Sequence, residues 1–172
     1  MRRPVFVLGL VAALLALGCS RPQTKVQELP TGPLTKSEYV HAFDVSAAGL
    51  APKYGVGADL PPDAPAADQD AHVVALQRLL RAWADRLEGL QPPAPAARAQ
   101  ARYVAGIRSF ATDLDRARAA LAHGDIKGAA ALLASGRIVS TATRAHLAAA
   151  RRAFHTLDYD LQDLDTAPVK TP

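Results

Sequence analysis

Apolar residues recur every three or four positions along most of this 172-residue chain from residue 71 onward. The clearest run consists of Tyr103, Ile107, Phe110, Leu114, Ala117 and Leu121. Alternating steps of four and three place all of these on one side of an α-helix, which is the pattern of a helix that packs against others. No segment shows a convincing β-strand pattern. The sequence therefore predicts an all-α fold.

The first predicted helix begins at a capping box. Thr35-Lys36-Ser37-Glu38 places a hydroxyl and a carboxylate three residues apart, so each can accept a hydrogen bond from the other's backbone N–H. Gly49 and Pro52 mark its end, and we expect a long loop from Lys53 to Asp70.

The next two predicted helices meet at a proline turn. The second runs from Ala71 to Leu90, with Gln77 expected on its solvent side. Pro92-Pro93 ends it and starts the third, because proline suits a first helical turn and disrupts a helix interior. His123-Gly124 ends the third helix with a glycine suited to a left-handed cap.

A short helix and a last long helix complete the pattern. Asp125 is predicted to cap the short helix, which runs through Leu133 and closes at Gly136. The last helix is predicted from about Ile138 to Leu164. Its expected packing side consists of Val139, Ala142, His146, Ala149, Ala153, Leu157, Leu161 and Leu164. Four amphipathic helices with short connections pack most simply as an antiparallel four-helix bundle, here with one extra short helix.

The chain begins with the pattern of an export signal. Two arginines, Arg2 and Arg3, precede an apolar run from Val5 to Leu17, which is too short for a stable transmembrane helix. We interpret 1–18 as a signal peptide and 19–34 as a flexible tether that can reach roughly 50 Å. A helical domain then spans 35–165, and 166–172 form a disordered tail.

Leu15-Ala16-Leu17-Gly18-Cys19 resembles the lipobox of bacterial lipoproteins, in which a cysteine receives a diacylglyceryl group and becomes the new N-terminus. Cys19 is the only cysteine. The resemblance implies a chain anchored in a membrane through Cys19, with its polypeptide on the extracytoplasmic side. The anchor would lie in the outer face of the cytoplasmic membrane of a Gram-positive host or in the outer membrane of a Gram-negative one. An ordinary cleaved secretion signal is the alternative.

The start of the helical domain has a further resemblance. Leu34-Thr35-Lys36-Ser37-Glu38-Tyr39-Val40 is similar to the opening helix of uncharacterised secreted proteins and lipoproteins of actinobacteria, and Leu90-Gln91-Pro92-Pro93 is similar to a second motif of that group. The resemblance implies a secreted helical bundle and carries no activity. In many members a cysteine after the opening helix pairs with a later cysteine, whereas this chain has Val45-Ser46-Ala47-Ala48 at that place.

Charge and composition exclude several classes of function. The formal charge is +4 and falls to about +2 without Arg2 and Arg3. Arginines and aspartates are interspersed, so the sequence does not predict a nucleic-acid surface. Beyond Cys19 the chain has no cysteine, and its methionine is Met1, so it offers neither a disulfide nor the soft ligands that Cu(I) prefers.

Candidate ligand residues are few and scattered. His41, Asp44 and His72 are the candidates for binding a small molecule or metal ion, and His146 is a further imidazole. Glu38 and His41 form one Glu-x-x-His pair, whereas a di-iron bundle needs two. The sequence has no C-x-x-C-H haem motif and neither G-x-S-x-G nor S-x-x-K. We therefore predict no cofactor and no catalytic site.

Acidic residues gather near the end of the last predicted helix. They are Asp158, Asp160, Asp163 and Asp165. Carboxylates there oppose the helix dipole, and they are candidates for binding a cation or a basic partner. The sequence as a whole predicts a non-catalytic interaction module of the cell envelope, with an envelope protein as candidate partner. A binding protein for a metal ion or small molecule is the alternative.

Overall fold

The computed structural model describes residues 34–49 and 64–161. These residues form helices and turns without a β-strand, so the predicted all-α fold is confirmed. The elements are α1 (Lys36–Ala48), α2 (Ala66–Glu88), the 3₁₀ turn η2 (Ala94–Ala96), α3 (Ala97–Asp113), α4 (Asp115–Ala122), α5 (Ile126–Ala134) and α6 (Thr141–Thr156).

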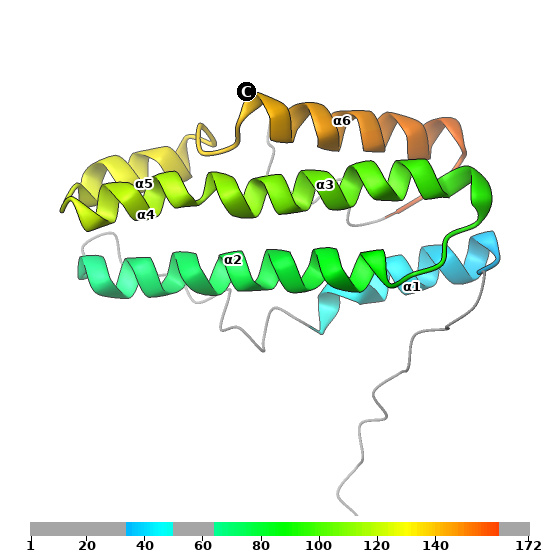
Figure 1. Ribbon diagram of the computed structural model, residues 1–172, viewed down its shortest axis with the longest axis horizontal. Coiled ribbons are helices and arrows are strands. Elements are labelled where there is room, and N and C mark those ends of the chain that lie inside the picture. The colour runs from blue at the N-terminus through cyan, green and yellow to red at the C-terminus, as the bar shows by residue number, and fades with distance from the viewer. Residues whose placement is uncertain (1–33, 50–63, 162–172) are drawn as a thin grey trace, which may run out of the picture.

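The helices form a bundle whose two ends are built from different helices (Figure 1). α2 runs along its whole length, antiparallel to α3 and α4, which follow each other almost in line. At one end α1 and α6 complete a four-helix arrangement. At the other end α5 packs on α4 as the extra short helix.

Aromatic side chains fill the core of the four-helix end. Tyr39 and Phe43 of α1 contact Phe154 of α6, and Phe43 lies 5.4 Å from Tyr103 of α3, measured between ring centroids. Trp83 of α2 meets Tyr103 edge to face at 5.7 Å. Rings in such tilted and edge-to-face pairs add stabilisation beyond the apolar area that they bury.

The start of α1 confirms the predicted capping box. Thr35 N donates to Glu38 Oε2 over 2.9 Å, and Glu38 N donates to Thr35 Oγ1 over 3.3 Å. Leu34, which the sequence analysis places in the tether, is buried, and its N–H donates to Gln91 O. The packed domain therefore begins at the last residue of the predicted tether.

The predicted loop from 53 to 70 is too long at its C-terminal end, because α2 begins at Ala66. Pro65 precedes the first turn, and its carbonyl accepts from the N–H groups of Asp68 and Gln69. The first turn contains alanines and polar residues, so apolar periodicity does not reveal it.

Gln77 was predicted on the solvent side of α2 and is in fact 2 % exposed. Its Nε2 donates to Ala111 O and to Asp115 Oδ1, both over 2.8 Å. The two acceptors flank Leu114, where α3 gives way to α4. Gln77 thus ties α2 to the junction that divides the predicted third helix in two.

The last helix is shorter than the predicted 138–164. Ser140 caps its start by accepting from Thr143 N, and it ends at Thr156. Asp158 adopts a positive φ of 58°. The N–H groups of Asp158 and Tyr159 return to His155 O and Phe154 O, which is a Schellman termination.

The buried face of α6 is one position away from the predicted one. It comprises Thr143, Leu147, Ala150 and Phe154 instead of Ala142, His146, Ala149 and Ala153. The observed stripe contains the large apolar residues Leu147 and Phe154, whereas the predicted stripe relied on alanines, which occur on several sides of this helix. The buried face of α6 packs closely on α3 at Gly106. A Cβ at this position would lie 2.6 Å from Leu147 Cδ2, so the absence of a side chain permits the close approach of the two helices.

Candidate functional site

An open groove lies between α1 and residues 158–160. It has a volume of about 570 Å³ and is lined by Lys36, Ser37, Val40, His41, Asp44, Asp158 and Asp160. The groove thus brings two predicted ligand residues, His41 and Asp44, next to the two described members of the acidic cluster. His41 is exposed and Asp44 is half-buried.

Helix geometry and the Schellman turn produce this juxtaposition. His41 and Asp44 are three residues apart on α1 and therefore neighbours on its surface. The left-handed residue Asp158 reverses the chain at the end of α6 and directs residues 159–161 back along α1. Tyr159 is buried against Tyr39, with ring centroids 5.7 Å apart, which fixes this segment on the first helix.

Lys36 closes one side of the groove. Its Nζ lies 3.6 Å from Asp158 Oδ2, donates to Leu157 O over 3.3 Å and stands 4.9 Å from the centre of the Tyr159 ring. The groove consequently combines a cation, an imidazole and three carboxylates in contact with solvent. Carboxylates in such a set can accept charge-assisted hydrogen bonds from a small cationic molecule or a basic side chain.

His72 does not line this groove. It lies on α2 two residues after Asp70, whose carboxylate accepts from Arg118 Nε of α4 over 2.8 Å. Among the residues that the structure describes, no three His, Cys, Asp or Glu side chains are grouped to hold a metal ion. Of the three predicted ligand residues, the structure places only His41 and Asp44 together.

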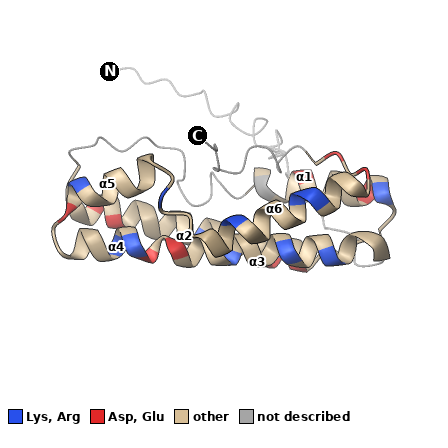
Figure 2. Cartoon of the chain, turned by 90° about the horizontal axis from the view of Figure 1, so that it is seen from above, with Lys and Arg blue, Asp and Glu red and all other residues tan. Residues whose placement is uncertain are grey.

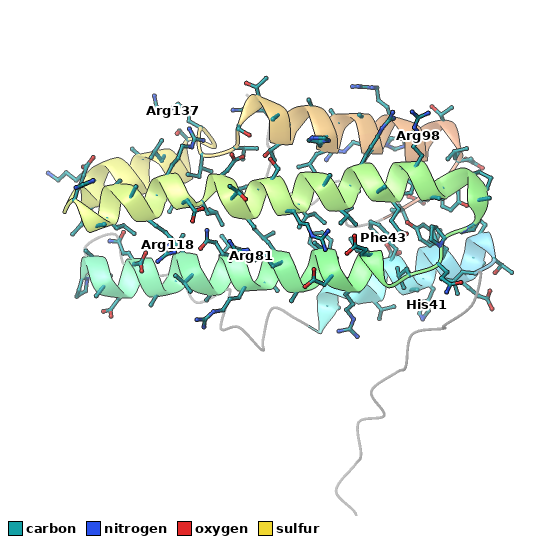
Figure 3. The ribbon with its side chains drawn as sticks, in the orientation of Figure 1. His41, Phe43, Arg81, Arg98, Arg118 and Arg137 are labelled. Atoms are coloured by element: carbon teal, nitrogen blue, oxygen red, sulfur yellow. The ribbon has the colours of Figure 1, made fainter. Side chains whose placement is uncertain are left out.

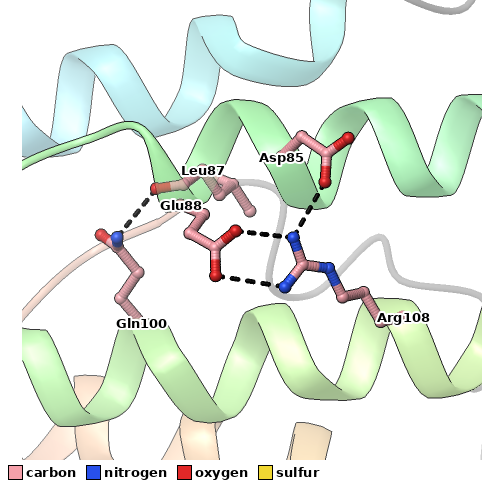
Figure 4. A network of polar contacts seen from close by, with 5 residues as sticks. All are labelled: Asp85, Leu87, Glu88, Gln100 and Arg108. Atoms are coloured by element: carbon pink, nitrogen blue, oxygen red, sulfur yellow. Dashed lines mark hydrogen bonds and ion pairs between the residues drawn. The ribbon is translucent and has the colours of Figure 1, made fainter.

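Another polar network lies on α2 and α3, and the sequence analysis did not find it (Figure 4). Arg108 donates to both carboxylate oxygens of Glu88 over 3.1 and 2.6 Å and to Asp85 over 2.9 Å. This arginine lowers the pKa of Glu88. Close by, Gln100 Nε2 donates to Leu87 O in the last turn of α2 and to Leu90 O just beyond it. The network fastens α2 to α3.

Hydroxyl groups near the start of α6 are also structural. Asp113 Oδ2 accepts from Ser140 N and from Thr143 Oγ1, both over 2.7 Å, and Thr143 lies 2.6 Å from Ser109 Oγ. Ser140 caps α6 through its side chain, and Thr143 is fully buried.

Shifted pKa values occur where the structure has a cap, an ion pair or a buried ring. Hydrogen bonds from Thr35 lower the pKa of Glu38, and burial raises the pKa values of Tyr39 and Tyr159. Hydrogen bonding to Asp70 raises the pKa of Arg118. Each of these shifts has a structural cause.

Cys19, Asp163 and Asp165 lie outside the described residues. Among the described helices, none combines the length and apolar character that crossing a membrane requires. Comparison with protein-family models, curated proteins and solved structures finds no match to this chain. The lipobox and the actinobacterial resemblance stay predictions from the sequence.

Proposed function

We propose that this chain is a bacterial lipoprotein, anchored through a diacylglyceryl group on Cys19, whose extracytoplasmic helical bundle is a non-catalytic interaction module. The observation that carries the proposal is the position of the chain's only cysteine, directly after an apolar run and Leu15-Ala16-Leu17-Gly18. A single acyl chain binds a membrane only marginally, whereas two or more anchor it durably.

The geometry of the bundle is compatible with this role. Leu34 N donates to Gln91 O, so the predicted tether joins the bundle at the turn between α2 and α3. The groove opens at the same end, because it is lined by the first residues of α1. A partner with a basic side chain would find Asp44, Asp158 and Asp160 exposed there in part or in full.

Substitution of the cysteine tests the anchor. Cys19→Ser should move the protein from the detergent-extracted membrane fraction to the soluble or unprocessed fraction of the native host. Ser20→Ala changes the neighbouring residue and should leave the protein in the membrane. If Cys19→Ser is processed normally and still needs detergent, and not a high-salt wash, for extraction from the membrane, the proposal is contradicted.

Site-specific crosslinking tests the interaction role. A photoreactive residue at His41 should give a discrete adduct in intact cells, because this position is exposed in the groove. The same residue at Arg78, exposed on α2, is the matched control. Equal labelling at both positions would show that the groove has no preferred partner.

Binding of a small cationic molecule is the second candidate function. The observation in its favour is that His41 and Asp44 share the groove with Asp158 and Asp160. A ligand at 100 times its dissociation constant would stabilise the fold by about 2.7 kcal/mol, which is measurable as a rise in melting temperature. Asp44→Asn should abolish that rise, and Asp68→Asn, exposed on α2, should not.

A further inference from the structure

Two adjacent helices of the bundle are basic over most of their length. α6 contains Arg144, His146, Arg151, Arg152 and His155 and no carboxylate. α3 contains Arg98, Arg102 and Arg108, and its first carboxylate is Asp113 at its end. Arginines and aspartates were expected to be interspersed along the helices, and these two helices depart from that expectation (Figure 2).

Four of these arginines are exposed and form no ion pair with any residue in the described ranges: Arg98, Arg102, Arg144 and Arg152. Arg144 lies in the first turn of α6, at the other end of that helix from Arg152, and donates to Val139 O. Arg108, in contrast, is bound to Asp85 and Glu88. We call Arg98, Arg102 and Arg152 the basic face.

The packing of α3 on α6 brings the basic face together. Ser109 contacts Thr143, and Gly106 faces Leu147, so the two helices run antiparallel in a fixed register. Extending this register towards the start of α3 places residues 98–102 beside the last turns of α6, where Arg152 lies. Arg98 and Arg102 are four residues apart and therefore neighbours on one side of α3.

The basic face lies at the end of the bundle where the predicted tether joins. Lys36, the first residue of α1, donates to Leu157 O just past the end of α6, and Leu34 binds the turn before α3. The carboxylates of the groove lie on the α1 side. Figure 3 shows Arg98 next to α6 and His41 on the opposite side of the bundle. The exposed, unpaired arginines of the basic face therefore lie apart from the groove, in which Lys36 is paired with Asp158.

We propose that the basic face docks on the anionic phospholipid headgroups of the membrane that holds Cys19, so that the groove opens away from the membrane. This inference rests on the proposed function, because the anchor supplies the proximity. Arginine is well suited to binding phospholipid headgroups, because its planar guanidinium group can donate two parallel hydrogen bonds to the oxygens of one phosphate. Each basic residue near an anionic membrane surface strengthens binding about fivefold.

Vesicle binding by residues 20–172 tests the docking separately from the anchor. This chain lacks Cys19 and keeps every described core residue, all of which lie in 34–161. It should sediment with phosphatidylcholine vesicles that contain phosphatidylglycerol, at low salt, and much less with pure phosphatidylcholine. Replacing Arg98, Arg102 and Arg152 by Gln should weaken this binding about a hundredfold.

The matched control removes the same charge elsewhere. Arg78, Arg81 and Lys127 are exposed on α2 and α5, and their replacement by Gln should change binding by much less. Equal weakening by both triple variants would overturn the proposal, as would equal binding to both kinds of vesicle. Binding to a soluble polyphosphate without binding to vesicles would also overturn it. If Cys19 is not lipidated, the proposed anchor is refuted. Vesicle binding by residues 20–172 can still be interpreted, because this chain does not contain Cys19.

Discussion

Trp83 Nε1 donates a hydrogen bond to Ser46 Oγ over 2.9 Å, and this bond joins α2 to α1. Ser46 is fully buried and its hydroxyl in turn donates to Phe43 O over 2.6 Å. Contacts with α2 and with the aromatic core hold α1 in position, and with it one wall of the groove.

Removing the Ser46 hydroxyl should destabilise the protein. Ser46→Ala leaves the indole N–H without its acceptor, and we expect a loss of about 1–3 kcal/mol in the free energy of unfolding. Urea denaturation measures this loss. In a Trp83→Phe background the same substitution should cost clearly less, and an equal cost in both backgrounds would show that the bond contributes nothing.

Gln77 should contribute as much to the stability of the fold as an apolar core residue does. Gln77→Ala removes both hydrogen bonds to the α3–α4 junction and leaves a cavity, so we expect a loss of about 2–4 kcal/mol. Arg78→Ala, at the exposed neighbouring position, should stay within about 0.5 kcal/mol of the parent. Similar effects of the two variants in thermal denaturation would argue that Gln77 is exposed, as the sequence pattern suggested.

The close contact between α3 and α6 predicts a strong effect at Gly106. A Cβ there would lie 2.6 Å from Leu147 Cδ2, so Gly106→Ala should lower the free energy of unfolding by about 1–3 kcal/mol. At Gly89 a Cβ would have no neighbour nearer than 3.5 Å, and the backbone is right-handed. Gly89→Ala should leave the stability unchanged or raise it by up to about 1 kcal/mol. A tolerated Gly106→Ala would contradict the packing described.

Asp158 is strained in its left-handed conformation. A non-glycine residue there costs about 1–2 kcal/mol, and the exposed ion pair with Lys36 returns less than about 1 kcal/mol. Asp158→Gly should therefore raise the melting temperature. Asp160→Gly removes a carboxylate from the same groove without this relief and should not raise it. A lower melting temperature for Asp158→Gly would show that the turn depends on the carboxylate.

Tyr39 should make the protein sensitive to alkali. Burial raises the pKa of its hydroxyl above the ordinary value of about 10, so the folded state retains a proton that the unfolded state loses. The free energy of unfolding is therefore independent of this group below pH of about 10 and falls as the pH rises towards the higher folded pKa. Denaturation at neutral and alkaline pH measures the difference.

Tyr39→Phe should reduce that alkaline loss without abolishing it, because Tyr159 has a raised pKa as well. At neutral pH the variant should be at least as stable as the parent. The Tyr39 hydroxyl is buried and has no hydrogen-bond partner in the described part of the chain, so its removal relieves a desolvation cost. An unchanged alkaline transition would contradict this assignment.

Spacing and caps predicted much of the fold. Thr35 with Glu38 marked the start of α1, and Asp125 capped α5 by accepting from Gly128 N as expected. Gly124 terminates α4 with the predicted positive φ. These signals are local, so a few consecutive residues are enough to recognise them. The end of α6 was missed because aspartate seldom adopts the left-handed conformation that stops a helix.

The features that could not be predicted from the sequence depend on contacts between residues far apart in the chain. Gln77 fits the helical spacing of Val73, Leu80, Ala84 and Leu87, yet its polarity suggested solvent because its acceptors lie on other helices. His41 and Asp44 lie three residues apart on α1, and Asp158 reaches the same groove through a turn that sequence spacing does not show. His72 was grouped with them only by residue type.

The most direct test of the proposed function is the intact mass of the mature protein extracted from membranes of its native host. The account predicts a chain that begins at Cys19 and carries a diacylglyceryl group, with or without a third acyl chain on its N-terminus. A chain that begins at another residue, or an unmodified Cys19 in a membrane-free fraction, would contradict it.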